Sequence, residues 1–340
     1  MLIQRLCTLA DLPEIQRLAI DSPVGITSLP ADSEQLSAII EGSEAATDET
    51  VTFTGEERYF FVLEDPKSGR LAGCSSIMSA AGFSQPFHTF RNDIFMHASR
   101  ELGLQNRMHV LSLCHDLTGH SLLTGFYLDT PWKGLYPALK LNACGRLLFM
   151  ASHPQRFAES TAVEISGVCD EEGNSPFWDG LCRHFFDVDY REAERLGSSH
   201  GRSLLAELMP GYPIYVPMLP DATQEVIGQV RPASQLVYDI LMAEGFETDN
   251  YVDIFDGGPV VQAKTAELIS VRCSEVATVH IGEPGAATGT WLVANEKVRD
   301  FRACLAPLAW HPGEPLVLDT ALAGLLKVVE GDTLRLIGGD

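Results

Sequence analysis

Three adjacent residues, Cys114, His115 and Asp116, have the types of a nucleophile, a general base and the carboxylate that orients the base. They lie at the end of an apolar run that predicts a strand. Because neighbouring side chains of a strand point to opposite faces, Cys114 cannot lie against His115 there. We therefore expect Cys114 in the core, and His115 with Asp116 either as a hydrogen-bonded pair at the strand end or as part of a catalytic site.

Two other kinds of chemistry find little support in the sequence. The segment GCSSI at 73–77 approaches a nucleophile elbow but lacks the second glycine of GxSxG. His115 and His120 flank a glycine-containing loop, and no cysteine or carboxylate stands at a known ligand spacing from them. We expect no metal site and no permanently bound cofactor.

Several carboxylates recur beside predicted strands and turns: Glu164, Glu207, Asp253 and Asp256. A ligand with an ammonium or guanidinium group is held by carboxylates of this kind, in a bidentate manner for a guanidinium. We predict that Glu207, Asp253 and Asp256 bind substrate. Taken singly, each of these residues fits a solvated or capping turn residue better than a ligand contact, and the residues alone leave both interpretations open.

The stretch that must position these groups is residues 121–154, which has the pattern strand, loop, helix. An apolar run at 122–128 is followed by turn residues and then by an apolar segment at 138–151. Tyr136 and Pro137 stand at the helix entry, where a proline loses only an N–H that would be unpaired anyway.

Basic residues surround this helix start in a chain that is otherwise acidic. Lys133, Lys140 and Arg146 lie in or just after the loop, and free backbone N–H groups at a helix start attract phosphates. The stretch is either a seat for the pyrophosphate of a nucleotide-like cofactor or an ordinary strand–helix connection. Taken alone it favours the ordinary connection, since it contains no Walker-type motif.

The composition excludes several partners. The chain has 340 residues with 46 Asp+Glu and 24 Lys+Arg, and its formal net charge is −22. Nucleic acids and anionic membranes reward a basic surface, so neither is expected to bind. The acidity is compatible with a cationic substrate, although it could serve solubility alone.

Localisation and redox state follow from two absences in the sequence. We find neither a signal-peptide layout at the N-terminus nor an apolar run near the ~18 residues of a membrane span. The eight cysteines stand singly without a CxxC pair, as in a cytoplasmic protein with reduced thiols.

The pattern along the chain predicts a larger domain over 1–262, with an internal subdivision near 190–200 left open, and a small β-rich C-terminal region over 263–340. Residues 80–106 have mixed character and receive no assignment. The C-terminal region is predicted from short apolar runs read as strands: 268–272, 278–281, 290–294, 302–306 and 333–337.

Several strings, in order along nearly the whole chain, resemble the arginine N-succinyltransferases, and specifically their alpha chains. They are GITSLP at 25–30, FVLED at 61–65, HASREL at 97–102, LSLCHDLTG at 111–119, DEEGNSPFW at 170–178, AELMPGYPIY at 206–215, IGQV at 227–230 and GFETDNYVDIFDGGP at 245–259.

This resemblance implies an α+β, GNAT-like acyltransferase fold, with a mixed central sheet flanked by helices. It implies succinyl transfer from the co-substrate succinyl-CoA to the α-amine of L-arginine, the first step of arginine catabolism by the succinyltransferase pathway. In such a fold the strand at 122–128 splays from its neighbour, and backbone at Gly125, Phe126 and Tyr127 faces the pantetheine and thioester. The loop with Lys133 would then seat the pyrophosphate.

Two departures from the family pattern stand out. Members carry IGQVHP, whose histidine is regarded as a proton donor, whereas this chain has Arg231 at that position. An arginine cannot exchange protons near neutral pH, although it can stabilise a thiolate or a carboxylate. Members are also glycine-rich at the helix start, where this chain has Tyr136 and Pro137.

These departures leave an alternative open, a non-catalytic or regulatory alpha subunit of a heteromeric arginine/ornithine succinyltransferase. The resemblance further implies a related beta chain or a homo-oligomer as partner. L-ornithine is a second possible acceptor for the succinyl group.

Overall fold

The computed structural model describes residues 1–22, 29–48, 51, 54–84, 86–170, 172–200 and 207–338. Residues 25–28 of the first family string, Glu171 and Ala206 lie outside this part. The strands, in chain order, are β1 Ile3–Leu6, β2 Arg58–Asp65, β3 Arg70–Met78, β4 Thr89–Ser99, β5 Leu104–Cys114, β6 Ser121–Leu128, β7 Ser160–Glu164, β8 Ile214–Tyr215, β9 Glu247–Val252, β10 Pro259–Lys264, β11 Glu275–Ile281, β12 Gly289–Asn295, β13 Arg302–Leu308, β14 Leu316–Leu318 and β15 Thr333–Gly338.

The helices lie between these strands. They are α1 Leu12–Asp21, α2 Ser33–Ala46, α3 Tyr136–Ser152, α4 Arg183–Phe186, α5 Tyr190–His200, α7 Asp221–Val226, α8 Gln235–Ala243, α9 Ile269–Arg272 and α10 Thr320–Leu325, with a π-helical turn at Trp178–Cys182. No helix in the described ranges is both long and apolar enough to cross a membrane.

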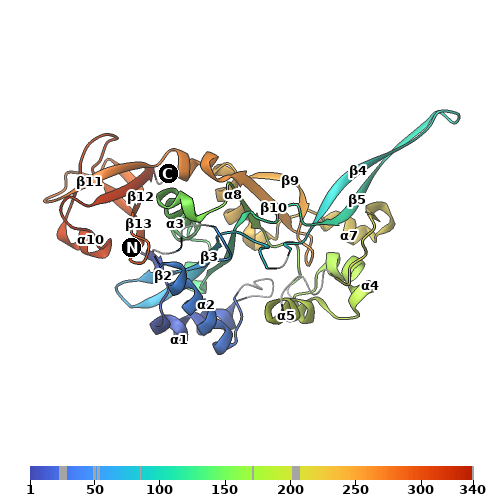
Figure 1. Ribbon diagram of the computed structural model, residues 1–340, viewed down its shortest axis with the longest axis horizontal. Coiled ribbons are helices and arrows are strands. Elements are labelled where there is room, and N and C mark those ends of the chain that lie inside the picture. Colours follow the sequence, from blue (N-terminus) through green and yellow to red (C-terminus); the bar gives the residue numbers. More distant parts are fainter. Residues whose placement is uncertain are drawn as a thin grey trace.

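One continuous sheet runs the length of the molecule (Figure 1), in the order β14-β11-β15-β12-β13-β1-β2-β3-β6-β7-β10-β9-β4-β5-β8. Neighbouring strands are antiparallel, except that β6 pairs with β7 and β11 with β14 in parallel. The sheet is therefore mixed, with helices on both faces. This confirms the predicted α+β class.

The two faces of the sheet are covered by different helices. Phe60 and Val62 of β2 pack with α1 and α2, whereas Tyr59, Phe61 and Leu63 pack with α3. This is the alternation that a strand buried on both faces must show. At α2, the Asp32 carboxylate accepts the Gln35 N–H at 2.9 Å and so caps the helix start.

Helix α3 is buried on all sides from residue 138 to residue 150. It lies on the N-terminal strands, and it also contacts α8, α9 and the C-terminal strands β12 and β13. The ring of Phe149 lies 5.1 Å from that of Tyr59, 5.3 Å from that of Phe61 and 5.0 Å from that of Phe301. This helix therefore joins the C-terminal region to the rest of the core.

The structure changes the prediction at several elements. Residues 268–272, predicted as a strand, form the helical turn α9, because the buried Glu244 carboxylate accepts the Ser270 N–H and hydroxyl at 2.8 and 2.9 Å. Strand β10 begins at Pro259 and runs across the predicted boundary at 262. Residues 80–106 hold β4 and the start of β5, which form the long hairpin in Figure 1.

We predict that Phe149→Ala lowers the free energy of unfolding by about 3–5 kcal/mol, because it leaves a cavity among aromatic rings. Urea denaturation followed by circular dichroism measures the change. Phe83→Ala is the matched control, since that ring is 76% exposed and its loss should cost less than about 0.5 kcal/mol. Equal effects of the two variants would contradict the central place of α3 in the core.

Candidate active site

Strands β6 and β7 stop pairing with each other partway along β6. They pair in parallel only at Ser121, Leu122 and Leu123, opposite residues 161–163 of β7. Strand β6 continues to Leu128, and no described strand pairs with the β7-facing edge of residues 124–128. The backbone of this half of β6 is therefore available to a ligand that enters between the two strands.

A bulge lies at the same place on the other edge of β6. Cys74 of β3 pairs with Tyr127 and Ser76 pairs with Thr124, so β6 has one extra residue between these pairs. Gly125 lies in the bulge with φ of +61°, a conformation that L side chains rarely adopt.

Two side chains of α3 fill the gap that the bulge opens between β3 and β6. The Asn142 amide donates to the carbonyls of Cys74 and Tyr127 at 3.0 and 3.3 Å. The Arg146 guanidinium donates to the carbonyls of Ser76 and Thr124 at 2.9 and 3.3 Å. The carbonyls around the bulge thus keep hydrogen-bond partners, which buried backbone groups require.

Arg146 is a buried cation next to this opening. It is 1% exposed, and it takes part in no ion pair among the described residues. Burial lowers the pKa of Arg146 to about 10. The guanidinium carbon lies 5.7 Å from the ring centroid of Phe126. The sequence suggested Arg146 as a cation near the phosphate loop, but it lies in the third turn of α3 and points at the bulge.

The opposite wall of the opening carries the position where this chain departs from the family pattern. Beyond β7 the Ile165 N–H donates to the Pro259 carbonyl on the β10 side, at 3.0 Å. Alternate residues of an extended strand use opposite edges, so Ser166 faces the β6 side. There its carbonyl accepts the Arg231 N–H at 2.9 Å. Arg231 therefore lies on the edge of β7 that borders the opening.

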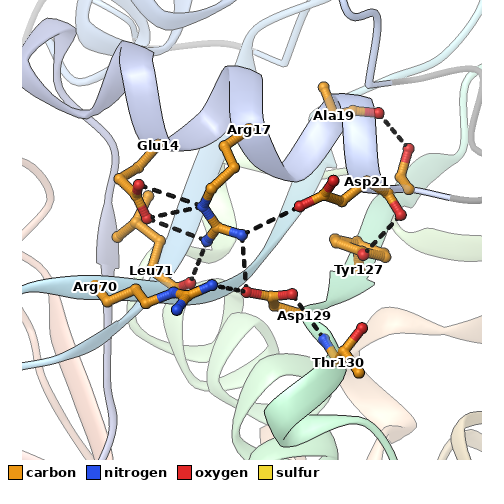
Figure 2. A network of polar contacts seen from close by, with 10 residues as sticks. Glu14, Arg17, Ala19, Asp21, Arg70, Leu71, Tyr127, Asp129 and Thr130 are labelled. Carbon is orange, nitrogen blue, oxygen red and sulfur yellow. Dashed lines mark hydrogen bonds and ion pairs between the residues drawn. The ribbon is translucent and has the colours of Figure 1, made fainter.

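The loop that follows β6 is fixed by a charged network (Figure 2). The carboxylate of Asp129, which is 4% exposed, contacts Arg17 at 2.8 Å and Arg70 at 3.2 Å and accepts the Thr130 N–H at 2.7 Å. Arg17 also contacts Glu14 at 3.1 Å. Helix α1 thereby holds the end of β6 in place.

The loop itself presents a basic side chain. Lys133 is exposed, and its Nζ lies 5.3 Å from the ring centroid of Tyr127. The Tyr127 hydroxyl donates to the Asp21 carbonyl at 3.1 Å. Lys140, the other predicted phosphate contact, is 9% exposed on α3 and lies 5.9 Å from the Tyr136 ring centroid.

The predicted substrate carboxylates Asp253 and Asp256 belong to a buried turn. The Asp253 carboxylate accepts the N–H groups of Phe255 and Asp256 at 2.6 and 3.0 Å. The Asp256 carboxylate accepts those of Gly167 and Gly258 at 2.7 and 2.8 Å. These bonds attach the turn to the wall that carries Arg231. They also use part of the hydrogen-bond-accepting capacity of each carboxylate.

His115 lies close to His88, and the charge of Glu207 acts on the same imidazole. The imidazole centroids of His88 and His115 lie 6.3 Å apart. Burial lowers the pKa of His88, the His115 charge adds to this, and the Glu207 charge opposes it. His115 lies on the loop before β6, at the end of the strand away from the bulge, and its neighbour Asp116 contacts Arg91 at 2.7 Å. The described residues contain no group of three or more histidine, cysteine or acidic residues that could hold a metal ion.

Comparison with known proteins gives the family. Residues 2–270 match the family model described as "Arginine N-succinyltransferase beta subunit", and residues 275–338 match that of the same subunit's C-terminal domain. This chain belongs to the arginine N-succinyltransferase family. The resemblance drawn from the sequence strings is thereby confirmed.

The family members most useful for comparison match along their whole length. The chain is 55% identical over 338 residues to "Arginine N-succinyltransferase subunit alpha" of Pseudomonas aeruginosa strain PAO1, covering 99% of each chain. It is 38% identical over 341 residues to "Arginine N-succinyltransferase" of Enterobacter sp. strain 638, covering 99% of this chain and 97% of the relative. A solved structure titled as arginine/ornithine succinyltransferase subunit AI from P. aeruginosa superposes with a TM-score of 0.91 at 53% identity, covering 99% and 98%.

The sequence did not single out two residues of this candidate site, Asn142 and Asp129. Asn142 stands inside an apolar helical run that otherwise predicts only core. A polar residue at a position that must be buried is the signal that could have found it, because such a side chain needs partners. Asp129 read as a turn residue, and nothing local indicates its contacts with Arg17 and Arg70.

We predict that Asn142→Leu lowers the free energy of unfolding by about 2–5 kcal/mol. The substitution keeps the number and branching of the side-chain heavy atoms but leaves the carbonyls of Cys74 and Tyr127 buried without these donors, at about 1–3 kcal/mol each. Chemical denaturation measures it. An unchanged midpoint would show that the bulge does not depend on the α3 side chains.

The Asp129 network predicts a pH dependence of stability. Burial acts to raise the pKa of Asp129, but the Thr130 N–H and the two arginines outweigh it, so the pKa lies below its ordinary value. A depressed carboxyl pKa contributes stability above the ordinary pKa of about 3.9, and this is lost as pH falls through the lower folded-state pKa.

We therefore expect Asp129→Asn to cost about 1–3 kcal/mol at pH 7, as for hydrogen bonds to a charged group. The difference from the parent should shrink once the pH falls below about 3.9. Thermal denaturation at several pH values measures both curves. A difference that persists undiminished at acid pH would exclude the ion pairs as its cause.

Proposed function

We propose that this chain transfers the succinyl group of succinyl-CoA to the α-amine of L-arginine, giving N2-succinylarginine and CoA, as the first step of arginine catabolism by the succinyltransferase pathway. The observation that carries the proposal is family membership over nearly the whole chain together with the opened edge of β6. Relatives named without a subunit label also match across 99% of this chain, which favours an active enzyme over a purely regulatory subunit.

In this proposal the acyl-CoA lies between β6 and the continuation of β7. Backbone at Gly125, Phe126 and Tyr127 faces the pantetheine and the thioester carbonyl, since it has no described strand partner on that edge. The pyrophosphate lies at the loop before α3, where Lys133 is exposed.

The reaction is attack of the neutral α-amine on the thioester carbonyl. A C–N bond forms, the C–S bond breaks, and the electron pair leaves with the CoA thiolate. Backbone N–H groups along the bulge stabilise the oxyanion of the tetrahedral intermediate, where losing one donor typically costs about 10²–10³ in rate. The α-ammonium must first lose a proton, because the pKa of a free α-amino group is about 7.7–8.0.

Two roles remain, stabilisation of the departing thiolate and acceptance of the amine proton, and we assign them to Arg231 and His115. Arg231 borders the opening and stabilises the departing thiolate as a fixed cation, with water as the proton source. His115, in the group with His88 and Glu207, is our candidate acceptor for the amine proton, through water. Glu207, Asp253 and Asp256 are the candidate carboxylates for the guanidinium of arginine or the side-chain ammonium of L-ornithine.

We also propose that the enzyme works in the cytoplasm, because its eight cysteines are all free. Its partner is a related beta chain or a further copy of itself. The word "subunit" in the names of its P. aeruginosa relatives supports an assembly.

Turnover by the purified chain tests the proposal. CoA release is followed with succinyl-CoA and a panel of arginine, ornithine and an uncharged amino acid. We expect turnover with a basic acceptor and a rate that rises towards pH 8. If arginine and ornithine both fail while the uncharged amino acid reacts, the assignment of a cationic substrate is wrong.

Gly125→Val tests the role of the bulge. The side chain cannot adopt the glycine φ without moving backbone at the thioester, so kcat/KM for succinyl-CoA should fall about 10²-fold or more. Gly69→Val is the matched control, because Gly69 has φ of +71° in the β2–β3 turn with open space around it. Similar losses in both variants would attribute the effect to general strain.

A further inference from the structure

A carboxylate stands at the point where β6 and β7 stop pairing. The last pair of the two strands is Leu123 with Val163. Thr124 and Glu164 follow them, at the first position of the opening. Strand β7 is an interior strand of the sheet, between β6 and β10. Ionisable side chains are uncommon on such strands, which otherwise supply core residues, so the position of Glu164 indicates a specific role.

The side chains of Thr124 and Glu164 lie on the face of the sheet opposite α3. Leu122 of β6 and Ala162 of β7 belong to a cluster separate from that of α3, and the next residue of each strand packs with α3. Side chains two residues apart on a strand share a face, which places Thr124 with Leu122 and Glu164 with Ala162. Glu164 also pairs with Val260, another member of the separate cluster.

The Thr124 hydroxyl has no hydrogen-bond partner among the described residues, although its oxygen is buried. Buried polar groups nearly always have a partner, so such a hydroxyl marks a place for a ligand or a water. The residue as a whole is half-buried, and rotation about χ1 can present its hydroxyl to the opening. Glu164 is half-buried as well. A hydroxyl and a carboxylate therefore face one opening from the two strands that form its walls.

Both groups lie beside the position proposed for the thioester. Thr124 directly precedes Gly125, the residue of the bulge whose backbone faces the thioester carbonyl in the proposed function. A group held between Thr124 and Glu164 is thus next to the carbon that reacts. Holding two reactants in contact in this way supplies a large part of the rate of a bimolecular reaction.

We propose that Glu164 and the Thr124 hydroxyl bind the α-amine of the acceptor amino acid. The carboxylate holds the ammonium form, and it continues to accept an N–H after the proton has left. The neutral amine has two N–H groups and one lone pair. With one N–H on Glu164 and the other on Thr124, the lone pair is left for the thioester carbon. The inference rests on the proposed function and deepens it, because the carboxylates named there bind the cationic side chain of the acceptor.

Calorimetry of the full chain in the presence of CoA tests these contacts with two ligands, L-arginine and δ-guanidinovalerate, which is arginine without its α-amine. We expect the parent to bind arginine more tightly than the deaminated compound. Glu164→Gln should weaken arginine binding about 10- to 100-fold, as for hydrogen bonds to a charged group, and leave the deaminated compound unchanged. Thr124→Val should weaken arginine binding alone, by about threefold to tenfold.

Two controls separate a contact with the amine from damage to the sheet. Glu159→Gln changes an exposed carboxylate just before β7 and should bind both compounds as the parent does. Glu164→Asp keeps the charge and should recover part of the affinity for arginine. In turnover assays Glu164→Gln should raise the KM for arginine and leave the KM for succinyl-CoA unchanged.

The outcomes distinguish this assignment from the proposed function. If Glu164→Gln weakens both compounds equally, or leaves arginine binding unchanged, the assignment is overturned, while turnover of arginine by the parent keeps the proposed function. A Thr124→Val variant that binds arginine like the parent would exclude the hydroxyl. A parent that binds neither compound overturns the proposed function together with the assignment.

Discussion

The hydrogen bonds from α3 to the bulge of β6 are the constraint on which the rest of this structure depends. A strand that parts from its neighbour and carries an extra residue on its other edge would leave carbonyls unpaired inside the core. Asn142 and Arg146 supply donors to four of them, at 2.9–3.3 Å. The bulge can therefore keep one conformation without a strand partner on the β7 side.

The same half of β6 is held at its far end by charge. Asp129 joins the loop after the strand to Arg17 of α1 and to Arg70 at the start of β3. Helices on both faces of the sheet thus fix β6. Helix α3 does so through the Asn142 amide and the Arg146 guanidinium, and α1 does so through Arg17. The opening between β6 and β7 is built by this double attachment, and Arg231 lies on its other wall.

Positive and negative charges are distributed unevenly over the molecule. The chain as a whole is strongly acidic, with a formal net charge of −22, while the buried cation Arg146 lies against the ring of Phe126. The projecting end of the β4–β5 hairpin, residues 94–109, carries two arginines and one glutamate and exposes several large apolar side chains.

The sequence by itself determined the local units and the family. The predictions of a strand–loop–helix unit at 121–154 and of most C-terminal strands are confirmed, because apolar periodicity and helix entry signals are local properties. The quoted strings were enough to identify the family, and the family implied the splayed strand. The prediction of a strand at 268–272 was wrong, because a run of five residues with three apolar side chains fits a strand or a helical turn until Glu244 supplies a cap.

Only the tertiary structure decided the rest. A projecting hairpin exposes both faces, so β4 and β5 lack the alternation of buried and exposed residues that reveals a strand, and residues 80–106 looked irregular. Arg146 resembled a phosphate ligand in sequence, yet its helix turns it inwards to carbonyls 22 and 70 residues away. Asp253 and Asp256 resembled ligands and are engaged with backbone N–H groups of their own turn and of Gly167. Which polar groups meet is set by long-range packing, and residue type and spacing carry no record of it.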